Sequence, residues 1–219
     1  MTHGPVGSAA KIEGELPLGR LEAFSDGVFA IAITLLVLEL GVPIVAGQDL
    51  LGAIAAQWPS ILAYITSFLT IGAVWIAHST LTGALRAADG TLYRLNLLVL
   101  LVTSFLPFPT KLITQFTDNP DAERVATVFY GLVLLALSLS MTVFIRYAFE
   151  QRRLIKDHID DETVQAVGRR GPGYVVYLVA IAIAWVAPQV ASILYLAAAV
   201  YLTIPARTIR RLLRRYRPS

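Results

Sequence analysis

The sequence contains no cysteine, which excludes disulfides, thiolate metal sites and cysteine nucleophiles. Charged residues are also scarce: they make up 15% of the 219 residues, against about a quarter in a typical soluble domain. The three histidines, His3, His78 and His158, are widely separated and no H-E-x-x-H occurs. The sequence therefore predicts neither a metal site nor a disulfide-stabilised domain.

Apolar residues dominate the chain, with 56% hydrophobic residues and a mean hydropathy of +0.66. They form blocks long enough to cross a bilayer, which takes about 20 residues per helix. We expect an all-α integral membrane protein of one domain with six transmembrane helices. The expected spans cover approximately residues 20–42, 59–81, 91–113, 122–149, 174–187 and 189–204. The last two are short and separated around Pro188, so they form either a helical hairpin or one re-entrant pair.

Proline and polar residues indicate where the predicted helices begin, bend and end. Residues 49–58 suggest a short interfacial stretch, and Pro59 suits the first turn of the second span. Pro107 and Pro109 are expected to bend the far end of the third span. Three regions follow: a mobile cytoplasmic N-terminal tail (1–19) without the apolar core of a signal peptide, the six-helix domain (20–206) and a basic cytoplasmic C-terminal tail (207–219).

The distribution of basic residues predicts the orientation in the membrane. With the N-terminus inside, all of the 18 lysines and arginines fall on the inner side except Lys111 and Arg124. Short inner loops carry such an excess, so both termini are expected to be cytoplasmic. The arginine-rich tail is interpreted as a topology anchor, with contact to anionic lipid headgroups as the alternative.

The first span has a distinct arrangement of side chains. At 100° per residue, an apolar stripe with one hydroxyl shares a face, which Phe24 extends toward the cytoplasm. The stripe consists of Gly27, Ile31, Thr34, Leu35 and Leu38. Ser25 and Asp26 project away from it, and an acid within a membrane helix needs polar partners.

Candidate partners for Asp26 lie at the same predicted depth. Trp75 and His78 share one face of the second span, and Asn96 and Arg94 lie near the inner end of the third. The pattern favours a buried polar cluster that fixes the first helix to its neighbours. The alternative is that Ser25 and Asp26 only cap that helix at headgroup level.

These residues resemble the signature of the transmembrane-protein-175 potassium channels. The resemblance consists of R-x-x-x-F-S-D at residues 20–26, T-L-L-V-L-E at 34–39, W-x-x-H at 75–78 and N-x-L-x-L-L with S-F-L-P-F within 96–108. It covers mainly the first three spans. The combined motif is specific, whereas F-S-D alone is not.

The resemblance implies a potassium-permeable cation channel without a T-V-G-Y-G filter, with the first helix of each protomer lining a central pore. A single F-S-D copy is similar to the bacterial members, which implies a homotetramer in a bacterial plasma membrane. It implies potassium as the permeant ion, no cofactor and no nucleic-acid partner. The implied pore constriction is Ile31, Leu35 and Leu38, with Thr34 tied to selectivity. The implied structural network behind the pore helix is Arg20, Phe24, Ser25, Asp26, Trp75, His78 and Asn96.

Other interpretations remain open at this stage. Glu39 either attracts cations at the outer mouth or is an interfacial acid without such a role. A stripe of Ile and Leu is also typical of simple packing. The rival functions are a secondary transporter, for which two related halves are expected, an intramembrane enzyme and an accessory membrane subunit.

Overall fold

Helices are the regular elements of this protein in the computed structural model, which describes residues 17–40, 49–115, 119–157, 159 and 173–203. One isolated antiparallel bridge, Leu85 to Ile155, accompanies them within these ranges. The helices are α1 (Leu18–Leu35), η1 (Leu36–Glu39), α2 (Leu50–Ala56), α3 (Trp58–Ala84), α4 (Gly90–Phe105), α5 (Pro107–Gln115), α6 (Pro120–Glu150), η2 (Arg152–Leu154), α8 (Tyr174–Ala184) and α9 (Pro188–Thr203). The all-α prediction is confirmed. Residues 1–16 of the predicted N-terminal tail and the whole predicted C-terminal tail lie outside the described residues.

Four helical stretches are long and apolar enough to cross a membrane. They are Leu18–Glu39, Trp58–Ala84, Gly90–Gln115 and Pro120–Glu150, and two shorter apolar helices, α8 and α9, follow. The bounds agree closely with the predicted first four spans. At 1.5 Å per residue, the 11 residues of α8 reach only about 16 Å, roughly half of the hydrocarbon thickness.

Local sequence explains where several helices begin. Asp49 caps α2 by accepting from the backbone N–H groups of Leu51 and Gly52, and Asn119 caps α6 in the same way, ahead of Pro120. Such caps satisfy N–H groups that have no partner within the helix. The third span divides at Leu106 into α4 and α5 because Pro107 and Pro109 cannot donate to the preceding turn.

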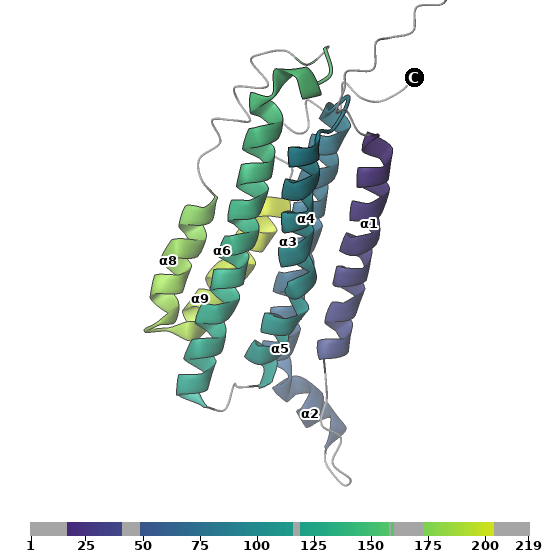
Figure 1. Cartoon of the computed structure of the whole chain (residues 1–219). Coiled ribbons are helices and arrows are strands. Elements are labelled where there is room, and N and C mark those ends of the chain that lie inside the picture. The colour runs from purple at the N-terminus through teal and green to yellow at the C-terminus, as the bar shows by residue number, and fades with distance from the viewer. Residues whose placement is uncertain (1–16, 41–48, 116–118, 158, 160–172, 204–219) are drawn as a thin grey trace, which may run out of the picture.

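The helices form a bundle with α1 at one side and the α8–α9 hairpin at the other (Figure 1). α1 packs against α3 and α4, whereas α9 packs against α3, α6 and α8. Gly131 of α6 allows the α8–α9 hairpin to approach closely. A Cβ atom at this position would lie 2.7 Å from Ile181 Cγ1 and 2.8 Å from Tyr195 Cζ. Both distances are shorter than van der Waals contact, so a glycine is required for α6, α8 and α9 to pack this closely.

The hairpin reaches the end of the bundle where α6 begins. There Gln189 Nε2 donates to both carboxylate oxygens of Glu123, at 2.9 Å each. The other end of α8 lies beside the middle of α6, because a Cβ atom on Gly173 would be 3.8 Å from Ser138 Oγ. Within the described residues the hairpin therefore covers the first half of α6.

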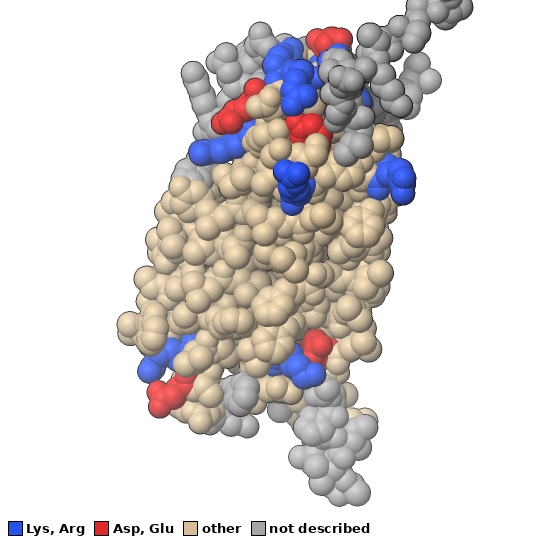
Figure 2. Space-filling model, in the orientation of Figure 1, with Lys and Arg blue, Asp and Glu red and all other residues tan. Residues whose placement is uncertain are grey.

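Charged side chains gather at the two ends of the bundle and leave an uncharged belt between them (Figure 2). One end, hereafter the basic end, carries seven of the lysines and arginines of the described residues: Arg20, Arg86, Arg94, Arg146, Arg152, Arg153 and Lys156. The opposite end carries Lys111 and Arg124. This pattern is typical of a protein whose middle lies in hydrocarbon.

Candidate functional site

One face of α1 is left uncovered by the rest of the protomer. The buried residues of α1 and η1, namely Leu21, Ser25, Phe29, Ala32 and Leu36, recur every three or four positions and define the inner face. The opposite face exposes large apolar side chains: Ile31 is 61% exposed, Leu35 42% and Leu38 73%. The predicted stripe thus lies on the uncovered face, where it can contact lipid, water or another subunit.

The far end of this helix departs from the expected regular geometry. Leu36 to Glu39 form a 3₁₀-helix, in which residues three apart lie directly above one another. Leu38 therefore lies in line with Leu35 instead of rotating away from it. The larger rise of a 3₁₀-helix, about 2 Å per residue, also places Leu38 farther from Ile31 than an α-helix would.

Thr34 is exposed on the same face, and its hydroxyl bonds to the helix itself. Thr34 Oγ1 donates to the carbonyl oxygens of Ala30 at 3.0 Å and Ile31 at 2.9 Å. A hydroxyl has one hydrogen and two acceptor lone pairs, so the oxygen keeps acceptor capacity on its outward side. This arrangement can interact with a cation but has no hydrogen left to donate to an anion.

Three predicted polar residues meet in a buried chain of hydrogen bonds between α1, α3 and α4. His78 Nε2 lies 2.7 Å from Asn96 Oδ1, and Asn96 Nδ2 donates to Ser25 Oγ at 2.9 Å. Ser25 Oγ in turn donates to the Leu21 carbonyl at 2.7 Å. Because Asn96 Oδ1 only accepts, His78 Nε2 carries the hydrogen, and each bond then has one donor and one acceptor.

The histidine of this chain is also enclosed by aromatic rings. The imidazole of His78 stacks on Phe144 of α6 at 5.4 Å with a 5° angle between planes, and Phe29 of α1 meets it edge-on at 5.4 Å. His78, Asn96 and Ser25 are each at most 2% exposed. The cluster therefore fixes the rotation of α1 about its axis relative to three other helices.

The remaining predicted network residues lie outside this buried chain. Asp26 accepts from Trp75 Nε1 at 2.8 Å, but both side chains are on the protomer surface. The expectation that Asp26 lies in a buried cluster is wrong for the single protomer, because its side chain points about 100° away from that of Ser25. Arg20 and Phe24 are exposed too, and within the described residues neither forms a hydrogen bond with the cluster.

Glu39, at the end of η1, lies beside a basic side chain of α5. Glu39 Oε2 is 3.2 Å from Lys111 Nζ, and the glutamate side chain is only 18% exposed. The ion pair joins the end of the first crossing to the third. The positive charge of Lys111 also offsets the negative charge that an outer-mouth role for Glu39 requires, so the geometry favours the alternative of an interfacial acid without that role.

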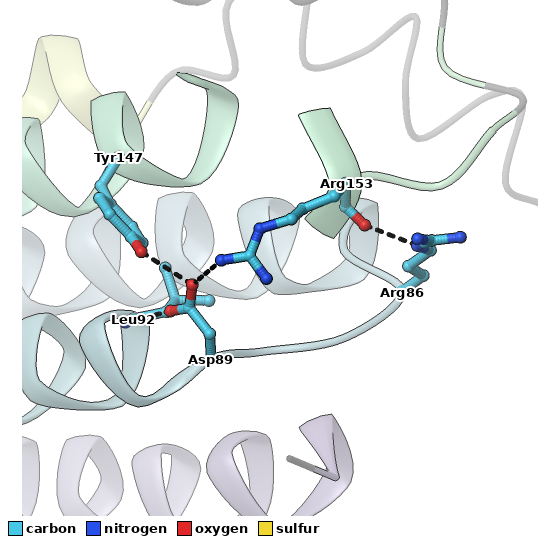
Figure 3. Close-up of polar contacts among 5 residues, drawn as sticks. All are labelled: Arg86, Asp89, Leu92, Tyr147 and Arg153. Carbon is cyan, nitrogen blue, oxygen red and sulfur yellow. Dashed lines mark hydrogen bonds and ion pairs between the residues drawn. The ribbon is translucent and has the colours of Figure 1, made fainter. Parts of the chain in front are cut away.

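A second polar cluster, at the basic end, was not predicted from the sequence (Figure 3). Asp89 Oδ1 accepts from the backbone N–H of Leu92 at 2.9 Å and so caps α4. Asp89 Oδ2 accepts from Tyr147 at 2.7 Å and from Arg153 NH2 at 2.6 Å. Burial raises the pKa of Asp89, but these bonds and the charge of Arg153 outweigh it and hold the pKa below its usual value.

The same cluster joins two chain segments through their backbones. The N–H of Arg86 donates to Leu154 at 2.9 Å, and the N–H of Lys156 donates to Ala84 at 3.1 Å. The Arg86 side chain adds a bond from Nε to the carbonyl of Arg153 at 2.6 Å. The α3–α4 turn and the segment after α6 are thereby held as one unit. The only sequence signal for it was the polar composition of both loops.

Comparisons with known proteins agree with this architecture. A family model described as endosomal/lysosomal potassium channel TMEM175 matches residues 20–107. A potassium channel of Chamaesiphon minutus is 38% identical over 174 residues, covering 77% of this chain and 84% of that protein. A crystal structure of a lysosomal potassium-selective channel TMEM175 homolog from the same organism has a TM-score of 0.74 and 35% identity, over 84% of this chain and 95% of that one. An endosomal/lysosomal proton channel TMEM175 of Mus musculus is 36% identical over 127 residues, which is 51% of this chain and 26% of that protein.

The uncharged belt, the apolar crossings and these similarities define an integral membrane protein of an ion-channel class rather than an enzyme. The chain belongs to the TMEM175 family. Its resemblance to that family, inferred above from the residues, is confirmed.

Proposed function

We propose that this chain forms a potassium-permeable cation channel whose pore is lined by the uncovered face of α1. The observation that carries the proposal is the large exposure of Ile31 and Leu38, at 61% and 73%, on a helix whose rotation is fixed by the buried polar cluster. Two bacterial relatives with the words potassium channel in their names cover most of this chain. Membership of an ion-channel family also favours a channel over a secondary transporter or an accessory subunit.

One α1 face cannot enclose a pore, so the proposal requires several copies. We infer a homotetramer with α1 of each subunit at the symmetry axis, in which Ile31, Leu35 and Leu38 each form a ring of four. From Ile31 to Leu38 the helix rises through four α-helical and three 3₁₀ steps, or roughly 12 Å. This is a longer apolar segment than a regular α-helix would give.

Such a segment controls conduction through its wetting and its diameter. A cation passing apolar rings loses water and gains nothing in return, so the barrier depends strongly on width. Between the rings, four Thr34 hydroxyl oxygens offer acceptors whose hydrogens are already bonded to the helix. They replace part of the hydration shell of potassium, which loses its water more readily than sodium.

The orientation follows from the charges. The basic end carries seven lysines and arginines of the described residues, and we place it at the cytoplasmic face of a bacterial plasma membrane. Ile31 then lies beyond the polar cluster, and Leu38 lies near the outer mouth.

The test is reconstitution of the purified full chain in planar bilayers or vesicles. A potassium–sodium gradient should give a reversal potential close to the potassium equilibrium value, and native mass spectrometry should give four copies. A conducting monomer would contradict the assembly, and absence of current in a verified tetramer would contradict the channel.

Proton conduction is a second candidate because the Mus musculus relative is named a proton channel. The exposed stripe from Gly27 to Leu38 contains no titratable side chain, so protons would have to cross on water through the apolar rings. A pH gradient imposed on the same bilayers, at equal potassium, separates the two candidates.

A further inference from the structure

A small cavity lies between α3, α5, α6 and α9, at the end of the bundle opposite the basic end. Its volume is about 80 Å³, and its apolar wall includes Leu62, Ile113 and Ile193. An engineered cavity of about 150 Å³ holds a benzene molecule. The present cavity therefore has room for a stem of only a few carbon atoms.

Glu123 is the one charged residue in the wall of this cavity. Its carboxylate accepts two hydrogen bonds from the Gln189 amide, each of 2.9 Å. Within the described part of the chain no basic side chain forms an ion pair with it. The adjacent Arg124 pairs instead with Asp121 at 3.2 Å. A carboxylate with uncompensated charge at an apolar cavity is suited to a cationic ligand.

Two hydroxyl groups of the cavity wall, those of Thr127 and Ser192, are suited to the same chemistry. Thr127 Oγ1 donates to the Glu123 carbonyl at 2.8 Å, and Ser192 Oγ donates to the Pro188 carbonyl at 3.1 Å. Their hydrogens are thus used within the helices, and the oxygens offer only lone pairs. A ligand that satisfies them must bring N–H or O–H donors.

We propose that this cavity binds a primary ammonium group carried on a short apolar stem. The ammonium lies at Glu123, with its N–H groups directed to the carboxylate and the wall hydroxyls, and the stem lies among the apolar side chains. Glu123 is in the first turn of α6 and the cavity also includes Trp58, the first residue of α3. This is the depth of lipid headgroups, so the ammonium comes either from an ethanolamine lipid or from a dissolved alkylamine.

The test measures thermal unfolding of the full chain in detergent while n-butylammonium is titrated. A ligand that binds only the folded protein raises the unfolding temperature with concentration. Tetramethylammonium has the charge without N–H donors, and n-butanol has the stem without charge, so neither should produce the shift. An equal shift with tetramethylammonium would overturn the proposal.

Substitutions test whether n-butylammonium binds in the cavity. Glu123→Gln keeps a carbonyl acceptor for Gln189 and should weaken n-butylammonium binding about tenfold or more, because a hydrogen bond to a charged group is lost. Glu150→Gln, the same change at the exposed far end of α6 and outside the cavity, is the matched control and should bind normally. Ile193→Trp fills the cavity from a side chain that is 59% exposed, so it tests the site even when Glu123→Gln fails to fold. Unchanged binding in either variant overturns the proposal.

Vesicles distinguish the two sources of the ammonium. Weaker n-butylammonium binding in phosphatidylethanolamine than in phosphatidylcholine supports the lipid headgroup, because it then competes for the cavity. Equal binding in both supports a dissolved amine. Since this readout requires no ion current, failure of the cavity proposal leaves the channel proposal unaffected.

Discussion

The Tyr147 hydroxyl donates to Asp89 Oδ2 at 2.7 Å, which bonds the last turn of α6 to the residue that caps α4. Arg153 reaches the same oxygen from beyond α6. One carboxylate therefore sets both the start of the third crossing and the end of the fourth. Because the α3–α4 turn is bonded to the same segment, the turn and the end of α6 form one hydrogen-bonded unit.

Replacement of Asp89 should loosen that unit. Asp89→Asn keeps an oxygen for the Leu92 N–H but loses the charge that pairs with Arg153, whose side chain is 47% exposed. After allowance for solvent screening, we expect the free energy of unfolding in detergent to fall by about 1 kcal/mol. Asp89→Ala also loses the cap and should cost about 1 kcal/mol more. Equal stability of Asn and Ala variants would contradict the capping role.

The contribution of Asp89 to stability should depend on pH. The folded-state pKa of Asp89 is lowered, so its contribution is fully present above the unfolded-state pKa of about 3.9 and is lost as pH falls through the folded value. The difference in unfolding temperature between the native chain and Asp89→Asn should thus be constant near neutral pH and shrink below about pH 4. A difference that grows with acid would contradict this assignment.

Thr34→Val should reduce potassium preference while leaving a conducting pore. Valine has nearly the same shape but lacks the oxygen, so one layer of acceptors is removed from the proposed pore. We expect the potassium-to-sodium permeability ratio to fall about fivefold, equivalent to roughly 1 kcal/mol. Thr34→Ser keeps the oxygen and is the matched control. An unchanged reversal potential would assign selectivity to pore width at Ile31.

Ile31→Asn should wet the proposed constriction, raise conductance and reduce discrimination between potassium and sodium. A tenfold increase in conductance corresponds to a decrease of about 1.36 kcal/mol in the free-energy barrier to ion passage. Ala32, although directed away from the stripe, is 1% exposed and part of the core, so it is unsuitable as a control. Val143→Asn, an exposed apolar position on α6, provides one. If single-channel currents of Ile31→Asn match those of the native chain, the stripe is ordinary packing.

Gly131→Ala should separate the α8–α9 hairpin from α6. The added methyl group overlaps Tyr195 and Ile181, and overpacking of this kind costs about 1–3 kcal/mol. Gly72→Ala is the control, because a Cβ atom there has nothing within 4 Å and alanine is the better helix former. Unfolding temperatures in one detergent compare the two. Equal values would show that the hairpin adjusts without strain.

The helices were predictable because their signals are local. Pro59 was expected in the first turn of the second span and occupies the first turn of α3. Pro107 and Pro109 were expected to bend the third span, and the structure interrupts it at Leu106. The amphipathic pattern of residues 20–42 placed Ile31 and Leu35 on one face, and both are exposed. These features depend on neighbours within four residues, which a sequence displays directly.

The contacts that were missed join residues far apart in the chain. Asp89 and Arg153 are separated by 64 positions, and nothing local indicates that Glu39 meets Lys111. Ser25 and Asp26 were expected to act together because both project away from the apolar stripe, yet a helix turns 100° between them. Ser25 consequently bonds to Asn96 in the core and Asp26 to Trp75 on the surface.

The division of the third crossing at Leu106 has a mechanical consequence. α3 is one uninterrupted helix of 27 residues, about 40 Å long, and tilting is one way in which such a helix adapts to a change in bilayer thickness. The neighbouring crossing is interrupted at Leu106, so we expect it to adapt through the angle between α4 and α5. Because η1 packs on α5 and Glu39 is paired with Lys111, a change in that angle would also displace the far end of the first crossing. We therefore expect lipid chain length to influence the position of the segment that holds Leu38.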